Sequence, residues 1–234
     1  MTLNSVSNDS FLNSLHQTVQ KFSVLKHSFY QAWSKGELTK DHLKNYAQEY
    51  FSHVNAFPQY ISKLHSICPT NSGRQLLLSH LIEEESGTEN HPELWCRFAE
   101  ELGAERTVLN TSHPSDAAQQ LVDKFRQLCG EDFATGLGAL YAYESQVPEV
   151  AEVKIEGLKK FYGIESTNGL AFFNVHRTAD VYHREQIANE LSHLTDTEKQ
   201  RALKGAQLGA QAVWDFLSSL PPTSENCNLN EKCH

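Results

Sequence analysis

The sequence has no apolar run that approaches the roughly 20 residues needed to cross a bilayer, and its first ten residues, MTLNSVSNDS, are polar. Basic charge is also scarce, because 20 Lys and Arg residues face 29 Asp and Glu residues, which gives a formal charge of -9. No basic cluster interrupts this balance, so a nucleic-acid partner lacks its electrostatic footprint. We therefore expect a cytoplasmic protein that binds neither nucleic acid nor membranes.

Cysteine is equally sparse. The five cysteines are an odd number without a CxxC pair, which is not the pattern of a disulfide framework. We expect free thiols. Cys96 and Cys129 stay candidates for a catalytic thiol, although a lone cysteine on a helix is more often a small core residue.

Helical periodicity is what the sequence does contain, in every long segment and without the alternation that marks a strand. With 234 residues, of which 39% are hydrophobic, the chain is long enough for one substantial core. The pattern predicts an all-α fold with a single domain over residues 1–220. The last residues, 221–234, mix Pro, Asn, Ser and charge, and we expect them to form a disordered tail.

Capping residues and helix breakers set the expected helix boundaries, because Thr and Ser favour helix starts and Gly favours helix ends. The expected helices span residues 11–33, 39–67, 71–86, 91–103, 114–130, 132–161, 168–191 and 195–220. The run FATGLGALYAYES in the segment 132–161 is rich in small residues that permit close helix approach. We expect this segment to be the central helix.

The segment HRTADVYH carries the most informative pattern of polar residues. His176, Asp180 and His183 are spaced i, i+4 and i+7, which places them on one face of a helix. The apolar neighbours, which include Val175 and Tyr182, predict that this face is at least partly buried. The same spacing also occurs on solvated helix faces, so the motif alone leaves both interpretations open.

Two other segments supply further candidate ligands. Glu84 and His91 flank a break at Gly87, and an interrupted helix can aim both side chains into one cavity, although an acidic run is often surface charge. Glu144 follows the apolar run LGALYAY. Burying an unpaired carboxylate costs several kcal/mol, so we expect Glu144 to be exposed, to be hydrogen-bonded or to meet a cation.

Taken together, these side chains offer three imidazoles and three carboxylates, a donor set that suits two iron or manganese ions with open positions for oxygen. The candidates for this set are Glu84, His91, Glu144, His176, Asp180 and His183. Thiolates are absent from the set, which argues against a structural zinc site.

Four segments in the same order resemble the CADD-like family, within the PqqC/TenA group of heme-oxygenase-like proteins. The resemblance extends from about residue 15 to 220, and its motifs are HSFYQAWSKGELT at 27–39, EEESGTENHPELW at 83–95, YAYESQVPEVAEVKIEGL at 141–158 and HRTADVYH at 176–183. It implies a heme-oxygenase-like bundle of about seven to eight helices that forms a homodimer. It also implies that the six side chains collected above are dimetal ligands.

The resemblance further implies an unusual activity, the supply of p-aminobenzoate for folate synthesis by oxygen-dependent oxidation of the protein's own tyrosine. The cofactor would be two iron ions or an iron/manganese pair, with oxygen as co-substrate and an external reductant. Tyr30 matches the tyrosine that becomes the aromatic ring, and Lys154 matches the source of the amine. We expect Tyr46 and Tyr143 to relay an electron or to hold the ring, although core packing alone also accounts for them.

Two alternatives remain. A PqqC/TenA-like enzyme would act without metal on an external small ring compound, but TenA-type thiaminases use a cysteine nucleophile, and residues 137–145 contain no cysteine. A non-enzymatic interaction protein is the second alternative, because the chlamydial member of the CADD-like family is named for its association with host death domains. Such a protein would present exposed apolar side chains.

Overall fold

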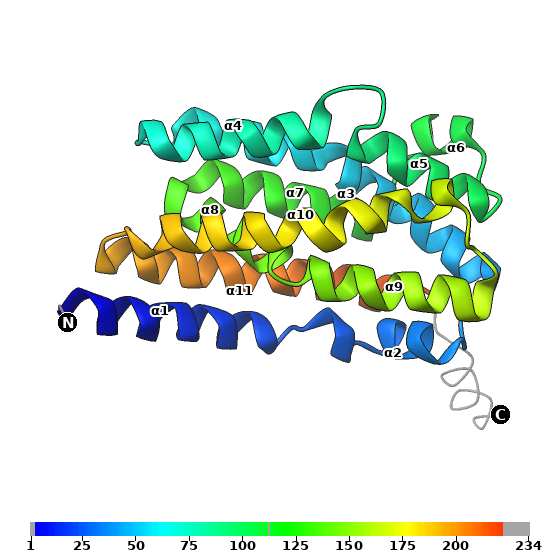
Figure 1. The fold of residues 1–234 in the computed structure, drawn as a ribbon, viewed down its shortest axis with the longest axis horizontal. Coiled ribbons are helices and arrows are strands. Elements are labelled where there is room, and N and C mark those ends of the chain that lie inside the picture. Colours follow the sequence, from blue (N-terminus) through cyan, green and yellow to red (C-terminus); the bar gives the residue numbers. More distant parts are fainter. Residues whose placement is uncertain (1–2, 112, 222–234) are drawn as a thin grey trace.

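The structure, a computed structural model, describes residues 3–111 and 113–221, with side chains described except at residues 3–9 and 178–181. Within these residues it contains helices and no strand, so the predicted all-α class is confirmed. The helices are α1 (Leu3–Gln20), the short 3-10 helix η1 (Val24–Lys26), α2 (Ser28–Lys35), α3 (Lys40–Ile67), α4 (Asn71–Glu85), α5 (His91–Glu101), α6 (Arg106–Thr111), α7 (Asp116–Glu131), α8 (Phe133–Glu144), α9 (Val147–Tyr162), α10 (Thr167–Ser192) and α11 (Asp196–Ser219). Most of them lie roughly along the long axis of the molecule (Figure 1).

The expected number of helices, seven to eight, is wrong, since the described residues contain eleven α-helices. The expected helix 11–33 is divided between α1, η1 and α2. The expected helix 132–161 is divided between α8 and α9, because Pro148 lies at the start of α9. Proline lacks the N–H that would continue α8, whereas the first turn of a helix tolerates its absence. The short helix α6 was not predicted.

Several boundaries that rest on capping chemistry are confirmed. Thr39 caps α3, where its hydroxyl accepts a hydrogen bond from the His42 backbone N–H at 3.1 Å. Thr195 caps α11 in the same way through Glu198. Pro58 lies inside α3 without ending it. Apart from Pro221, the expected disordered tail lies outside the described residues.

The helix predicted to be central, now α8, is the most enclosed of the bundle. It packs against α7, α10 and α11, and nearly every side chain from Ala134 to Glu144 is buried. Glycines allow the close approach of α11, because an added Cβ at Gly138 would collide with the backbone of Ala202 and one at Gly205 with the backbone of Thr135. This packing fixes Glu144, the last residue of α8, in the interior.

The remaining helices complete the core around α8. Helix α3 packs against α4, α5 and α7, and α10 packs against α4, α5, α8 and α9. The Trp95 indole N–H donates a hydrogen bond to the Ala47 carbonyl at 2.8 Å and so ties α5 to α3. Four helices, α4, α5, α8 and α10, thereby meet in the interior. None of the helices in the described ranges combines the length and the apolar character that a membrane span requires.

The contact between α8 and α11 gives a stability prediction. We expect Gly138→Ala to lower the free energy of unfolding by about 1–3 kcal/mol, because the added methyl group meets backbone that cannot move aside. Gly130→Ala in α7 is the matched control, since its nearest neighbour is the flexible end of Lys63 and Ala has the higher helix propensity. Urea unfolding measures both variants. Equal stability of the two variants would contradict the rigid contact.

Candidate metal centre

One group of buried donors joins α4, α5 and α10. Glu84, His91 and His176 each offer one ligand atom, and these atoms lie within 4.8 Å of one another. The sequence brings them together through the break at Gly87, which has a φ of 77° and ends the run of α4 before His91 opens α5. Nδ1 of His91 then lies 2.7 Å from Oε2 of Glu84. The prediction that an interrupted helix aims both side chains into one place agrees with this geometry.

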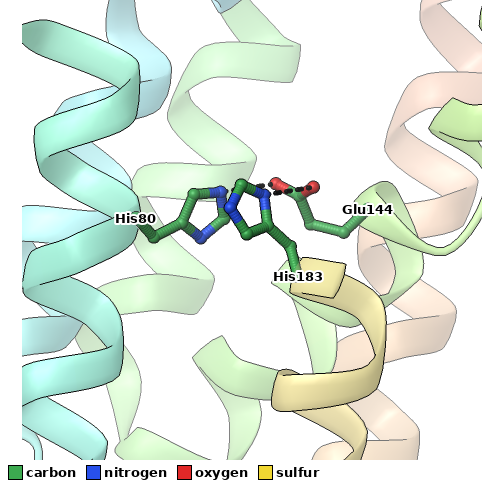
Figure 2. A group of neighbouring side chains, drawn as sticks. All are labelled: His80, Glu144 and His183. Carbon is green, nitrogen blue, oxygen red and sulfur yellow. Dashed lines mark ion pairs between the residues drawn. The ribbon is translucent and has the colours of Figure 1, made fainter. Parts of the chain in front are cut away.

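A second group lies beside the first and joins α4, α8 and α10. His80, Glu144 and His183 offer ligand atoms that are again within 4.8 Å of one another. Figure 2 shows both imidazoles turned toward the Glu144 carboxylate. Nε2 of His80 lies 3.3 Å from Oε1 of Glu144, and Nδ1 of His183 lies 4.0 Å from Oε2. Glu144 is 2% exposed, so it is not the exposed carboxylate that was one of the expectations. Its oxygens face two imidazoles in the interior.

Glu84 connects the two groups. Its Oε2 faces His91, whereas its Oε1 lies 3.8 Å from Nε2 of His80. His80 precedes Glu84 by one helical turn on α4, so both side chains project from the same face. With one oxygen directed at each group, the Glu84 carboxylate would bridge two cations held there.

Hydrogen bonds select which imidazole nitrogen faces the centre. Nδ1 of His176 lies 2.7 Å from the Phe172 carbonyl, which can only accept, so Nδ1 carries the proton and Nε2 keeps its lone pair. Burial, and then the proximity of His91, holds the pKa of His176 well below its usual range, so the ring is neutral. Nε2 of His183 donates to Glu83 at 2.9 Å, which leaves Nδ1 toward Glu144. Such outer hydrogen bonds are typical of metal-binding histidines.

Electrostatics also distinguish His80. Burial by itself would lower the pKa of this imidazole, but the nearby Glu144 carboxylate offsets that effect and the pKa lies above its ordinary value. Buried imidazole and carboxylate donors without thiolates suit iron or manganese. The residues present therefore fit a two-metal centre.

The predicted ligand set has three different outcomes. Glu84, His91, Glu144, His176 and His183 are brought together in the two groups. Asp180 lies on α10, but its side chain is outside the described residues. His80 was missed, although the spacing His-x-x-x-Glu before Glu84 is a signal that sequence reasoning can use. The predicted burial is confirmed for His176 and His183, although the apolar neighbours Val175 and Tyr182, on which the prediction rested, are 38% and 59% exposed.

A buried amine lies in an aromatic cage next to this centre. The Lys154 Nζ lies 5.0 to 5.9 Å from the centroids of six rings, those of Tyr30, Trp33, Tyr46, Tyr50, Trp95 and Phe173. It donates a hydrogen bond of 2.7 Å to the Tyr46 hydroxyl. Burial lowers the pKa of Lys154 to about 7. A large fraction of this amine is therefore neutral near pH 7 and can act as a nucleophile.

Tyrosines continue from this cage toward Glu144. The Tyr30 and Tyr46 hydroxyl oxygens are 3.5 Å apart, and burial raises the pKa of both phenols. The Tyr46 ring stacks on Tyr50 with centroids 5.3 Å apart. The Tyr50 hydroxyl donates to the Tyr143 hydroxyl at 3.2 Å, and Tyr143 precedes Glu144 in the chain. Sequence reasoning missed Tyr50, which joins the expected residues into one series.

A small cavity is lined by residues of both the cage and the first metal group. Its volume is about 40 Å³, and its wall includes Tyr30, Tyr143, Lys154 and His176. A cavity needs roughly 10–15 Å³ for each water-sized molecule, so this one has space for a few molecules the size of water or oxygen. The amine, the tyrosines and a candidate metal ligand thus line the same cavity.

Known proteins resemble this chain along most of its length. Residues 44–214 match the family described as iron-containing redox enzyme. A 4-aminobenzoate synthase of Chlamydia pneumoniae is 41% identical over 221 residues, which cover 94% of this chain and 98% of that protein.

Solved structures resemble the fold. A CADD-like protein of unknown function from Nostoc punctiforme has a TM-score of 0.75 at 18% identity, covering 92% of this chain and 97% of that one. A domain of unknown function with a heme oxygenase-like fold from Shewanella denitrificans also has a TM-score of 0.75, at 14% identity, covering 98% and 94%. The heme-oxygenase-like architecture expected from the resemblance is confirmed.

The bridging position of Glu84 gives a prediction for metal binding. We expect Fe(II), added without oxygen, to raise the melting temperature of the unaltered protein, because a ligand that binds only the folded state stabilises it. Glu84→Gln should abolish most of this rise, since both groups lose an anionic donor. The neighbouring Glu85 is exposed, and Glu85→Gln should behave like the unaltered protein. Equal shifts in the two variants would contradict the bridging assignment.

Proposed function

Because this chain belongs to the iron-containing redox enzyme family, we propose that it is an oxygen-dependent oxidoreductase that forms p-aminobenzoate from its own Tyr30. The relative from Chlamydia pneumoniae carries the name 4-aminobenzoate synthase and spans nearly the same length. The observation that carries the proposal is the position of the Lys154 amine, which lies among tyrosines in a cavity that His176 also lines.

The product sets the bonds that must change. p-Aminobenzoate has an aromatic ring with a carboxyl carbon and, opposite to it, an amine. A tyrosine side chain supplies the ring and that carbon, so the Cα–Cβ bond must break, Cβ must be oxidised to a carboxylate, and nitrogen must replace the phenolic oxygen. Oxygen is the oxidant and an external reductant supplies further electrons. The nitrogen comes from the Lys154 side chain, so its Cε–Nζ bond must also break, with Cε oxidised to an aldehyde and the phenolic oxygen released as water.

The local geometry supports an amine transfer within the cage. Lys154 Nζ lies 5.6 Å from the centroid of the Tyr30 ring and is held by the Tyr46 hydroxyl. The pKa of about 7 leaves much of the amine with a free electron pair. Tyr46 would orient this amine, and its hydroxyl would exchange protons with Tyr30. Enclosure by aromatic rings keeps bulk water away from the reacting groups.

The metal centre would supply the redox chemistry, since two reduced iron ions, or an iron/manganese pair, provide the electrons that oxygen takes up. Glu84, His91 and His176 would hold one ion, and Glu144 and His183 would hold the other, with Asp180 as the further ligand that the family resemblance implies. Tyr50 and Tyr143 would relay an electron between this centre and the cage, because their hydroxyls are hydrogen-bonded to each other.

The alternative with an external ring compound receives less support from the same cavity. Pockets for small molecules have volumes of about 300–1,000 Å³, whereas the cavity beside Lys154 has about 40 Å³. A thiol mechanism is also disfavoured, because burial raises the pKa of Cys129 to about 12 and that of Cys96 above its ordinary value. An occupant that is already part of the chain needs no larger space.

Mass spectrometry tests the source of the ring. Protein loaded with Fe(II) without oxygen, then given oxygen and a reductant, should release p-aminobenzoate and lose mass at Tyr30. Tyr30→Phe should bind the same amount of iron but form no product, because the phenol is absent. Tyr60→Phe is the matched control, since Tyr60 is equally buried in α3 and lies outside the cage. Product from Tyr30→Phe would refute the proposal, as would product without a change in chain mass.

The Lys154 amine gives a pH dependence with a defined sign. Its pKa is lowered to about 7, so the amine is protonated below this pH and neutral above it. The neutral fraction increases about tenfold between pH 6 and pH 8, and we expect the initial rate of product formation to rise with it. Lys159→Gln on the exposed side of α9 should keep this profile. Iron content is measured at each pH, and a rate that falls across this range at constant iron would contradict the role of Lys154.

A further inference from the structure

His80 is a buried imidazole that faces carboxylates without forming a well-aligned hydrogen bond to them. It is 2% exposed, and neither Nδ1 nor Nε2 makes a hydrogen bond with adequate geometry to a residue that the structure describes. Leaving a buried polar group unsatisfied costs about 1–3 kcal/mol. A side chain of this kind in a native core calls for a partner, and the direction of Nε2 indicates which one.

Nε2 of His80 points between two carboxylates. It lies 3.3 Å from Oε1 of Glu144 and 3.8 Å from Oε1 of Glu84. The His80 ring also packs on the ring of His183, with centroids 3.9 Å apart. Figure 2 shows the two imidazoles approaching the same carboxylate from α4 and α10. Two imidazoles that converge on one buried carboxylate form a cation site.

We propose that His80 is a metal ligand, in addition to the six that the family resemblance implies. It would complete a site of two imidazoles and one carboxylate with Glu144 and His183, which are already within 4.8 Å of its ligand atom. This inference rests on the proposed metal centre, but it does not depend on the product or on which tyrosine is consumed.

His80 would add a fourth imidazole to those of His91, His176 and His183. This addition has a consequence for the choice of metal. Affinity for nitrogen donors increases from Mn(II) to Fe(II), whereas oxygen-rich sites suit manganese. A site with imidazoles from both His80 and His183 therefore favours Fe(II). Without His80 the same site keeps a single imidazole beside its carboxylate, and its preference for iron declines.

The experiment compares His80→Ala and His80→Asp with the unaltered chain. Fe(II) binding is titrated without oxygen, and metal content is measured after incubation with equal Fe(II) and Mn(II). Loss of an outer hydrogen-bonding partner weakens metal binding about 10- to 100-fold. We expect His80→Ala to weaken one of the two sites by more than that. We expect His80→Asp to restore binding of two ions with a lower ratio of iron to manganese.

His53→Ala is the matched control, because His53 is 0% exposed and has an unpartnered Nε2 but belongs to neither metal group. It should bind both ions like the unaltered chain, and circular dichroism checks that each variant is folded. Pulsed EPR of Mn(II)-loaded protein should show one fewer nitrogen coupling in His80→Asp. A folded His80→Ala with unchanged affinity, or weakened only 10- to 100-fold with all nitrogen couplings retained, would overturn the assignment. If these metal results appear but no p-aminobenzoate forms, the proposed function fails and the His80 site stands.

Discussion

Two carboxylates buried within the helical bundle impose the constraint on which the rest of the site depends. Glu84 and Glu144 are 3% and 2% exposed, and a buried carboxylate is costly unless it is paired. Imidazoles from α4, α5 and α10 surround them. The close contact of α8 with α11, through Gly138 and Gly205, holds Glu144 at this depth. The bundle thus concentrates carboxylates and imidazole nitrogens where a divalent cation is the natural counterpart.

The aromatic cage and this centre lie on the same cavity, so residues of both line one space. His176 belongs to one metal group and also lines the cavity that contains Lys154 and Tyr30. The same burial acts in opposite directions on the groups present, because it lowers the pKa of Lys154 and raises that of Tyr30. Both shifts favour neutral forms. The amine therefore lies beside phenols that stay uncharged near neutral pH.

Much of this arrangement was predictable because it depends on local spacing. Thr39 and Thr195 predicted helix starts, because their hydroxyls cap the first turn. The spacing of His176 and His183 predicted that both lie on one helix face. Pro148 is an equally local signal for the division between α8 and α9. The apolar residues on both sides of it favoured one continuous helix, so the division was not predicted. His80 could have been found from its position one turn before Glu84. Tyr50 could not, since its significance comes from a hydrogen bond to Tyr143, 93 residues away.

The sequence by itself determined the all-α class, most helix boundaries and the donor types of a candidate metal centre, since periodicity, capping and residue chemistry are local properties. It also carried the resemblance to the CADD-like family, because motifs persist in order along a chain. Only the tertiary structure decided that the donors form two groups joined by Glu84, that His80 belongs to one of them and that Lys154 lies in a cage beside His176. These features depend on how α3, α4, α5, α8, α9 and α10 pack together, and the distances between side chains on different helices are set by the packing of the whole core.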